Sequence, residues 1–409
     1  MIQTLVPNNL YEHILKRKQI LQEARCIVVK VGSAVLTNER GLDKNIIENI
    51  VAQVAFLRAL PTSKDIERKI VLVSSGAVAA GRAALRQCCS HHEHPETTGL
   101  AAKQAAAAVG QSRLMQHYDT AFAKHGLGTA QILLTRDDLR ARQRFLNARN
   151  TFSELLSWGV VPVVNENDTI SVHELKFGDN DCLSGLLVNL VEADLFINLT
   201  SAKGVLGANP DENPNASILH YIDNIHDLNL DILCGGKTSV GTGGMYSKLL
   251  AARRVAQLGV PTLILPGKEK DIIRQVYETN ISDLNYSLGT WVNADNHTIS
   301  RRKFWLAYQS EPSGAIYVDN GASHALEYKG SSLLPGGICN VEGNFQNGSL
   351  VRIITEDKKQ NIGVGLSNYS ATEIRRIMGL KRHEVAAILG NAHYPEVIHR
   401  DNLLLDAAV

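Results

Sequence analysis

Short apolar runs alternate with helical stretches from Arg25 to about Gly267, and this alternation limits the possible folds more than any other feature. Strand-like runs of this kind occupy residues 26–31, 69–73, 159–164, 194–199 and 260–265. Ala-rich or Leu-rich helical stretches lie between them, for example at residues 77–85, 101–109 and 183–191. Strands that are apolar throughout are buried on both faces, and intervening helices connect parallel neighbours. The pattern therefore predicts an α/β fold with an open, mostly parallel sheet sandwiched by helices.

The character of the chain changes after about residue 280, where Gly and Ser become frequent. Short strand-like pieces occur at residues 315–318, 349–354 and 361–365, with turn signals such as Pro335-Gly-Gly between them. This pattern predicts a small, separate β-rich domain, and a chain of 409 residues is longer than one core usually supports. We expect an N-terminal extension, an α/β domain, a linker, and a β-rich domain that ends in two helices, over residues 1–24, 25–280, 281–300 and 301–400, respectively.

Charge and cysteine content exclude several classes of protein. The sequence has 42 Lys and Arg against 41 Asp and Glu, so no broad basic surface for nucleic acid is indicated. The six cysteines are scattered without a C-x-x-C pair, which is typical of a reducing compartment. The first 24 residues lack the apolar core of a signal peptide, and no apolar run reaches the roughly 20 residues that span a bilayer. We expect a soluble cytoplasmic protein with no membrane association.

Polar and glycine-containing loops follow two of the predicted strands. Ligands bind at the carboxyl ends of the strands in an open parallel sheet, so these loops are candidate site elements. Lys30-Val-Gly-Ser33 ends the first strand, where the glycine allows close approach of a ligand and the lysine supplies a cation. Ser74-Ser-Gly-Ala77 precedes a helix, whose first backbone N–H groups favour a carboxylate or a phosphate. Either loop alone also fits a plain strand end or an ordinary helix N-cap.

Three further loops have more unusual sequences. Asn165-Glu-Asn-Asp168 directly follows an apolar strand, and four polar residues there are costly to bury unless a ligand uses them. Gly178-Asp-Asn-Asp181 opens a helix with more polar groups than a cap requires. Gly241-Thr-Gly-Gly-Met-Tyr-Ser-Lys248 is a glycine-rich helix start that ends in lysine, although it lacks the spacing of a Walker P-loop. Lysines, glycine-rich turns and acidic loops at one sheet edge are typical of phosphoryl transfer.

Together, seven segments resemble the glutamate 5-kinase family of the amino-acid kinase superfamily, namely residues 28–33, 73–81, 131–136, 144–149, 161–168, 178–181 and 241–248. The C-terminal part resembles a PUA domain at residues 330–335 and 341–345. The resemblance covers roughly residues 25–400. It implies ATP-dependent phosphorylation of the L-glutamate γ-carboxylate to γ-glutamyl phosphate, the first step of proline biosynthesis.

The resemblance also implies roles for individual residues. The catalytic residues would be Lys30, Lys248 and Asp181, and glutamate would bind to Ser75, Asp168 and Asn180. ATP would contact Lys30, Thr200, Ser201, Thr242, Gly243, Gly244, Met245, Tyr246, Ser247 and Lys248. The sequence departs from the family at Ser201, where an Asp is usual, and at Cys182, where an Asn is common.

The same resemblance implies Mg²⁺ as cofactor, carried with ATP and without direct protein ligands. It further implies proline as feedback inhibitor and assembly into a homodimer or homotetramer. Two alternatives stay open. One is a related amino-acid kinase that acts on acetylglutamate, aspartate or UMP. The other is an RNA-binding protein that acts through the PUA-like tail, although residues 301–380 contain only nine Lys and Arg against seven Asp and Glu.

Overall fold

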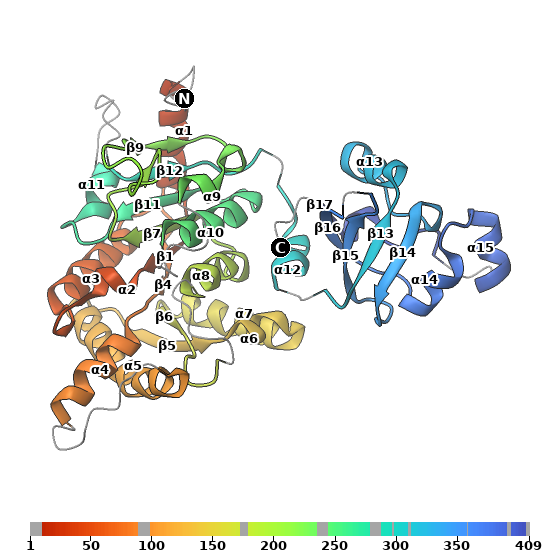
Figure 1. Ribbon diagram of the computed structural model, residues 1–409. Helices are drawn as coiled ribbons and strands as arrows, with labels where there is room; N and C mark the ends of the chain where they lie inside the picture. The colour runs from red at the N-terminus through yellow and green to blue at the C-terminus, as the bar shows by residue number, and fades with distance from the viewer. Residues whose placement is uncertain are drawn as a thin grey trace. The chain divides into compact units, whose positions relative to one another are not determined.

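The structure, a computed structural model, divides the chain into two compact units, Met1–Thr298 and Ile299–Val409 (Figure 1). It describes residues 10–88, 99–171, 179–234, 244–278, 288–296, 298–309, 312–357, 359–390 and 394–405. Within these ranges no helix is both long and apolar enough to cross a membrane.

The described residues of the first unit form an eight-stranded sheet. Its strands, in spatial order, are β10 (Tyr221–Ile222), β12 (Thr290–Val292), β11 (Thr262–Pro266), β7 (Leu195–Thr200), β1 (Cys26–Val31), β4 (Lys69–Val73), β6 (Val161–Glu166) and β5 (Thr129–Leu134). All neighbours pair in parallel except β11 and β12, which are antiparallel. This confirms the predicted mostly parallel sheet, and each of the five predicted apolar runs overlaps one of its strands.

Three strands of this sheet were not recognised in the sequence, namely β5, β12 and the two-residue strand β10. β5 is an edge strand whose side chains are mostly half-buried, so it lacks the continuous apolar run of a central strand. β12 lies inside residues 281–300, which the sequence predicted to be a linker, and its Trp291 is only 1% exposed. The correction is that part of this range belongs to the first sheet, because burial of the indole ring holds three residues in place. Three residues are too few to show a strand pattern.

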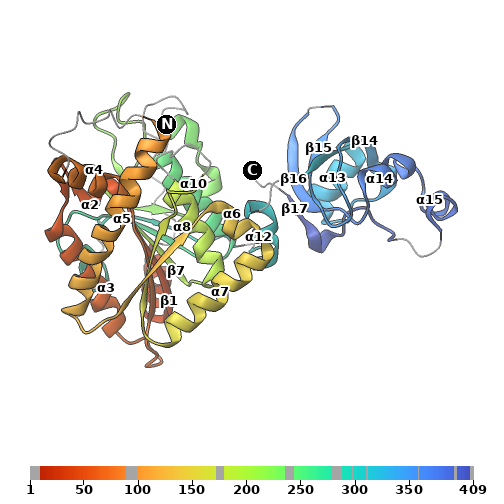
Figure 2. The same ribbon diagram turned by 90° about the horizontal axis from the view of Figure 1, so that it is seen from below.

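Helices cover both faces of the sheet, as Figure 2 shows. On one face lie α3 (Lys44–Ala59), α5 (Leu100–Ala123) and α11 (Ile272–Glu278), whose apolar side chains share a core with the strands. On the other lie α7 (Arg142–Ser157), α8 (Asp179–Leu190) and α10 (Met245–Gln257). Smaller elements complete the described part of this unit: α2 (Ser33–Leu36), β2 (Thr37–Asn38), β3 (Gly41–Leu42), α4 (Ala77–Cys88), α6 (Arg136–Arg140), β8 (Val205–Leu206), β9 (Ile218–Leu219), η1 (Ile225–Asp227) and α9 (Leu230–Leu233).

Alternation along β1 determines which side chains reach each face. Ile27, Val29 and Val31 join the core under α3 and α5. Lys30 points to the opposite face, where it contacts the start of α8. A single cation is therefore directed from an otherwise apolar strand toward the helix that begins beside it.

The N-terminal helix α1 (Leu10–Glu23) packs onto the first unit. Its Leu21 is buried in the main core. The buried guanidinium of Arg68 donates to the carbonyl oxygens of Leu21 and Gln22 at 2.9 and 3.1 Å, and so satisfies carbonyls at the end of the helix. The described part of the predicted extension is thus an integral helix of the α/β unit.

Helices α4 and α5 pack with their backbones in contact. A Cβ atom on Gly110 would lie 1.9 Å from the carbonyl oxygen of Ala77, and one on Gly81 would lie 1.7 Å from that of Ala106. Only glycine fits at such distances. The contact fixes the start of α4, directly after Ser75 and Gly76, against α5.

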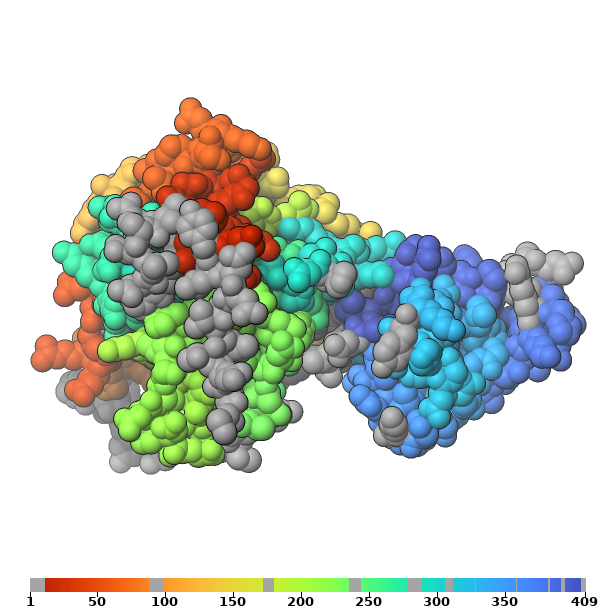
Figure 3. Space-filling view, turned by 90° about the horizontal axis from the view of Figure 1, so that it is seen from above, coloured from red at the N-terminus to blue at the C-terminus, as the bar shows by residue number. Residues whose placement is uncertain are grey.

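The second unit has its own five-stranded sheet in the order β14-β13-β15-β16-β17, in which only β13 and β15 are parallel among the described pairs. Figure 3 shows its described residues, in cyan to blue, gathered into one body. An apolar core of its own includes Ile316, Val351 and Ile353, and this confirms the predicted β-rich C-terminal domain. Its elements are α12 (Arg301–Gln309), β13 (Gly314–Val318), α13 (Asn320–Lys329), η2 (Pro335–Gly337), β14 (Ile338–Gly343), β15 (Leu350–Thr355), β16 (Asn361–Leu366), α14 (Ala371–Ile377), α15 (Arg382–Leu389), η3 (Arg400–Asn402) and β17 (Leu403–Leu405).

Candidate functional site

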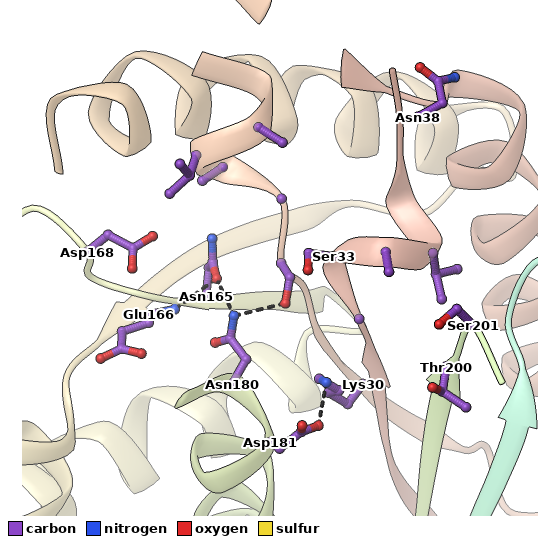
Figure 4. A pocket seen from close by; sticks show the side chains of 18 of the residues that line it. Lys30, Ser33, Asn38, Asn165, Glu166, Asp168, Asn180, Asp181, Thr200 and Ser201 are labelled. Carbon is purple, nitrogen blue, oxygen red and sulfur yellow. Dashed lines mark hydrogen bonds and ion pairs between the residues drawn. The ribbon is translucent and has the colours of Figure 1, made fainter. Parts of the chain in front are cut away.

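A cavity of about 540 Å³ opens at the carboxyl edge of the first sheet. Four neighbouring strands contribute to its lining: Gly32 follows β1, Ser75 follows β4, Asn165 is the second-last residue of β6, and Thr200 ends β7. Because these strands are parallel, their final residues meet at one edge. The structure therefore brings together the loops that the sequence selected separately, and Figure 4 shows their side chains around one space.

Asp181 joins two lysines in the floor of this cavity. The Lys30 ammonium group donates to Asp181 Oδ1, and Lys248 Nζ lies 3.3 Å from Oδ2 (Figure 4 draws the first of these contacts). Ser247 donates to the same Oδ2 at 2.6 Å. Exposure of Lys30, Asp181 and Lys248 is 3%, 1% and 6%. Three residues from β1, α8 and α10, distant in the sequence, thus form one buried ionic cluster.

The electrostatics of the cluster favour an ionised aspartate. Burial alone raises the pKa of Asp181, but the ammonium groups of Lys30 and Lys248 more than offset it, so this pKa lies below its ordinary value. Burial lowers the pKa of Lys30, and the neighbouring Lys248 lowers it further, while Asp181 opposes both. With both lysines protonated, two cations face one anion. The surplus positive charge suits an anionic ligand such as a phosphate group.

A neutral hydrogen-bond network forms the adjoining end of the cavity. Asn180 Nδ2 donates to Ser75 Oγ and to Asn165 Oδ1, both at 3.0 Å. Asp168 lines the same cavity. In Figure 4, Asn165 and Asp168 lie to one side of Lys30. The three residues predicted to bind glutamate therefore line one cavity together with Asn165.

The residues predicted to contact ATP are placed in three different ways. Thr200 and Ser201 line the cavity, on the other side of Lys30 in Figure 4, as do Gly244 and Met245 at the start of α10. Tyr246 packs against the apolar cluster around α10 and is not among the residues that line the described cavity. Thr242 and Gly243 lie outside the described residues.

Several residues at the cavity were not predicted from the sequence. Arg82 and Arg86 of α4 line the cavity, as does Lys103 of α5. The two arginines are four residues apart in the helix after Ser75, so they share one helical face, and this spacing was a usable signal. Asn198, fully buried in the apolar strand β7, donates to Asp181 Oδ1 at 3.4 Å. A lone amide inside such a strand was a second signal.

Comparison with known proteins adds two kinds of finding. Family models match residues 25–266 as "Amino acid kinase family" and residues 314–389 as "PUA domain". The chain is 60% identical over 394 residues to glutamate 5-kinase of Nitratidesulfovibrio vulgaris, covering 96% of this chain and 99% of that protein. It is 57% identical to the protein of the same name from Oleidesulfovibrio alaskensis, with the same coverage of both chains. Glutamate 5-kinase of Pelobacter propionicus is 45% identical over 391 residues, with 95% of this chain and all of that protein covered.

Proposed function

The chain belongs to the glutamate 5-kinase family, and from the geometry of its site we propose that it transfers the γ-phosphoryl group of ATP to the γ-carboxylate of L-glutamate. The observation that carries this proposal is the buried contact of Asp181 with Lys30 and Lys248 beside the amide network. One end of the cavity offers surplus positive charge for phosphate, and the other offers hydrogen-bonding groups for a small amino acid. The products are ADP and γ-glutamyl phosphate.

The mechanism follows from the charges of the two substrates. A glutamate side chain has an ordinary pKa of about 4.3, so its γ-carboxylate is ionised at neutral pH and needs no general base. An oxygen of this carboxylate attacks the γ-phosphorus atom while the bond to the β,γ-bridging oxygen breaks, and ADP leaves with the electron pair. Lys30 and Lys248 offset the repulsion between the two anions. Asp181 holds both ammonium groups in position.

The amide end orients the acceptor. We propose that the carboxylate of Asp168 pairs with the α-ammonium group of glutamate, because a charge-assisted hydrogen bond suits that group. Ser75 and Asn180 supply further hydrogen bonds to the amino acid. The γ-carboxylate is thereby directed toward the lysines.

The nucleotide occupies the opposite end of the cavity in this proposal. Thr200, Ser201 and the start of α10 surround the phosphates and the nucleoside. Thr242 and Gly243 keep their proposed part in ATP binding through the sequence Gly241–Lys248, whose glycines and helix N-terminus favour phosphate oxygens.

Mg²⁺ is the proposed cofactor, carried on ATP. The carboxylate oxygens of Asp181 already accept hydrogen bonds from Lys30, Lys248 and Ser247. Because protein donors occupy these oxygens, the site fits a Mg²⁺ ion whose ligands are phosphate oxygens. When bound, Mg²⁺ neutralises charge on the phosphates. Chelation should abolish activity, and added Mg²⁺ should restore it; full activity in excess chelator would contradict this part of the proposal.

Regulation and assembly are proposed from the family. We expect proline to inhibit by competing at the amide end, since its ammonium and carboxylate groups match those of glutamate. A homodimer or homotetramer is the expected assembly. We place the enzyme in the cytoplasm, because Cys26, Cys182, Cys234 and Cys339 are free thiols, which suits a reducing compartment.

The decisive assay traps the product. Hydroxylamine converts an acyl phosphate into a hydroxamate, so the purified chain should form hydroxamate from L-glutamate only when ATP and Mg²⁺ are present. Aspartate and acetylglutamate tested the same way should react far more slowly, and UMP should give no UDP. Preference for any of these three, or no hydroxamate at all, would refute the proposed substrate.

A further inference from the structure

Gln111 of α5 lies behind the amide end of the cavity and has no role in the mechanism above. Its side chain is only 9% exposed, and it is not among the residues that line the described cavity. Its Oε1 accepts a hydrogen bond of 2.9 Å from Asn165 Nδ2. We propose that Gln111 is a positioning residue that sets which atom of the Asn180 amide faces the α-ammonium group of the substrate. This inference rests on the proposed function.

The orientation of the Asn165 amide follows from its neighbours. The backbone N–H of Glu166 donates to Asn165 Oδ1 at 3.0 Å. A backbone N–H can only donate, so the oxygen of the Asn165 side chain must point toward it. Nδ2 of Asn165 is then directed at α5, where it donates a hydrogen bond to Gln111 Oε1.

Asn165 in turn orients Asn180. The Asn180 amide uses its two hydrogens on Asn165 Oδ1 and Ser75 Oγ. Its own Oδ1 is buried and, among the described residues, has no hydrogen-bond partner, while Asn180 lines the cavity. A buried carbonyl oxygen without a donor is unfavourable until a ligand supplies one. An ammonium group is such a donor, so the network presents an acceptor where the substrate nitrogen would lie.

Loss of the Gln111 acceptor would weaken the preference for the Asn180 orientation in which Oδ1 faces the substrate nitrogen. Asn165 Nδ2 would be left buried without its partner, and its side chain would no longer be held from both sides. Asn180 could then rotate and present its NH₂ group, which cannot accept a hydrogen bond from an ammonium group. Recognition of the substrate nitrogen would fall, whereas the lysine cluster on β1, α8 and α10 would keep its contacts.

Tyr118 provides a matched control on the same helix. It lies seven residues beyond Gln111, is fully buried, and its hydroxyl is 2.9 Å from Ser74 Oγ. Tyr118→Phe removes one buried hydrogen bond from α5 to the strand ends but leaves those of Asn165 and Asn180 in place. Any general loosening of α5 would affect both variants, whereas only the Gln111 substitutions remove the acceptor of Asn165 Nδ2.

The test compares L-glutamate with glutarate, which lacks the α-amino group. Calorimetry with Mg²⁺ and a non-hydrolysable ATP analogue gives Kd for each ligand, and the ratio of the glutarate Kd to the glutamate Kd measures recognition of the ammonium group. Gln111→Met and Gln111→Leu should lower this ratio about 10-fold or more, the effect of losing one hydrogen bond to a charged group. Gln111→Glu, which retains an acceptor oxygen, and Tyr118→Phe should keep the wild-type ratio. With saturating glutamate, kcat of Gln111→Met should change far less than the ratio.

An unchanged ratio in folded Gln111→Met, an equal fall in Tyr118→Phe, or a wild-type protein that binds both ligands equally well would overturn the inference. If neither apolar variant folds, Gln111→Glu is the deciding variant. Glutamate keeps an acceptor oxygen at position 111, so a lowered Kd ratio in this variant would contradict the proposal. The binding ratios need no turnover. Absence of hydroxamate formation by the wild-type protein would refute the proposed function separately.

Discussion

The lysine end and the amide end of the cavity share one frame but differ in charge. Asn180 and Asp181 are consecutive residues at the start of α8, yet Asn180 joins Ser75 and Asn165, while Asp181 joins Lys30 and Lys248. Coulombic attraction acts over distance with little dependence on direction, whereas amide hydrogen bonds require a defined geometry. The comparison indicates that the lysine end governs the rate of transfer and the amide end governs which acceptor is bound.

Removal of a cation should have the largest effect on turnover. Lys30→Ala and Lys248→Ala should each lower kcat about 10²–10³-fold, because each removes a contact to charge that develops during transfer. Steady-state kinetics at saturating ATP and glutamate measure this. Lys124→Ala, which removes an exposed lysine paired with Glu48, is the control and should leave kcat unchanged. Near-normal turnover in both cavity variants would show that the lysine end does not govern the rate.

Asp168→Ala tests the amide end. Loss of the carboxylate should raise KM for glutamate about 10- to 100-fold, the effect of removing a charge-assisted hydrogen bond, with a much smaller change in KM for ATP. Asp168→Asn keeps the shape of the side chain without its charge. Its KM for glutamate should lie between those of the wild type and Asp168→Ala. Equal increases in both KM values would contradict the division between the two ends.

Acid stability tests the charge of the lysine end without any substrate. The folded-state pKa of Asp181 lies below its ordinary 3.8, because the two ammonium groups outweigh the opposing effect of burial. Its stabilising contribution is therefore complete above the ordinary pKa and is lost as pH falls through the lowered one. Unfolding of the wild type and of Asp181→Asn, followed at pH values from about 7 to about 2, should show a stability difference that shrinks on acidification. A difference that is independent of pH would mean that Asp181 is not ionised in the fold.

Ser201→Asp should have the smallest effect and sharpens the comparison on the nucleotide side. Ser201 is exposed and lines the cavity, and its hydroxyl is neutral where the family usually has a carboxylate. We expect KM for ATP to fall a few-fold and the preference for ATP over GTP to rise. If KM for ATP and KM for GTP both match the wild-type values, the residue at position 201 has no role in nucleotide binding.

Much of the frame was predictable because burial leaves a simple pattern in the sequence. Central strands such as β1 and β7 are apolar throughout, and polar residues at their ends stand out. β12 could not be predicted, because its three residues are held in the sheet by the burial of Trp291.

The candidate site was predictable as a set of loops but not as a set of contacts. The sequence places Lys30, Asp181 and Lys248 more than sixty residues apart, and only the packing of α8 against β1 and of α10 against α8 brings them together. Gln111 gave no signal either, since a glutamine inside an alanine-rich helix is unremarkable until Asn165 is found beside it.

The most direct test of the account follows the oxygen atoms. L-Glutamate labelled with heavy oxygen in its γ-carboxylate is turned over with ATP and Mg²⁺ in the presence of hydroxylamine, and the released phosphate is analysed by mass spectrometry. Attack of the γ-carboxylate on phosphorus joins a labelled oxygen to the phosphoryl group, and hydroxylamine then cleaves the bond from that oxygen to carbon. Direct transfer to the γ-carboxylate predicts a single heavy oxygen in each phosphate released. Phosphate without the label would mean that ATP is hydrolysed by water, and this would contradict transfer to glutamate.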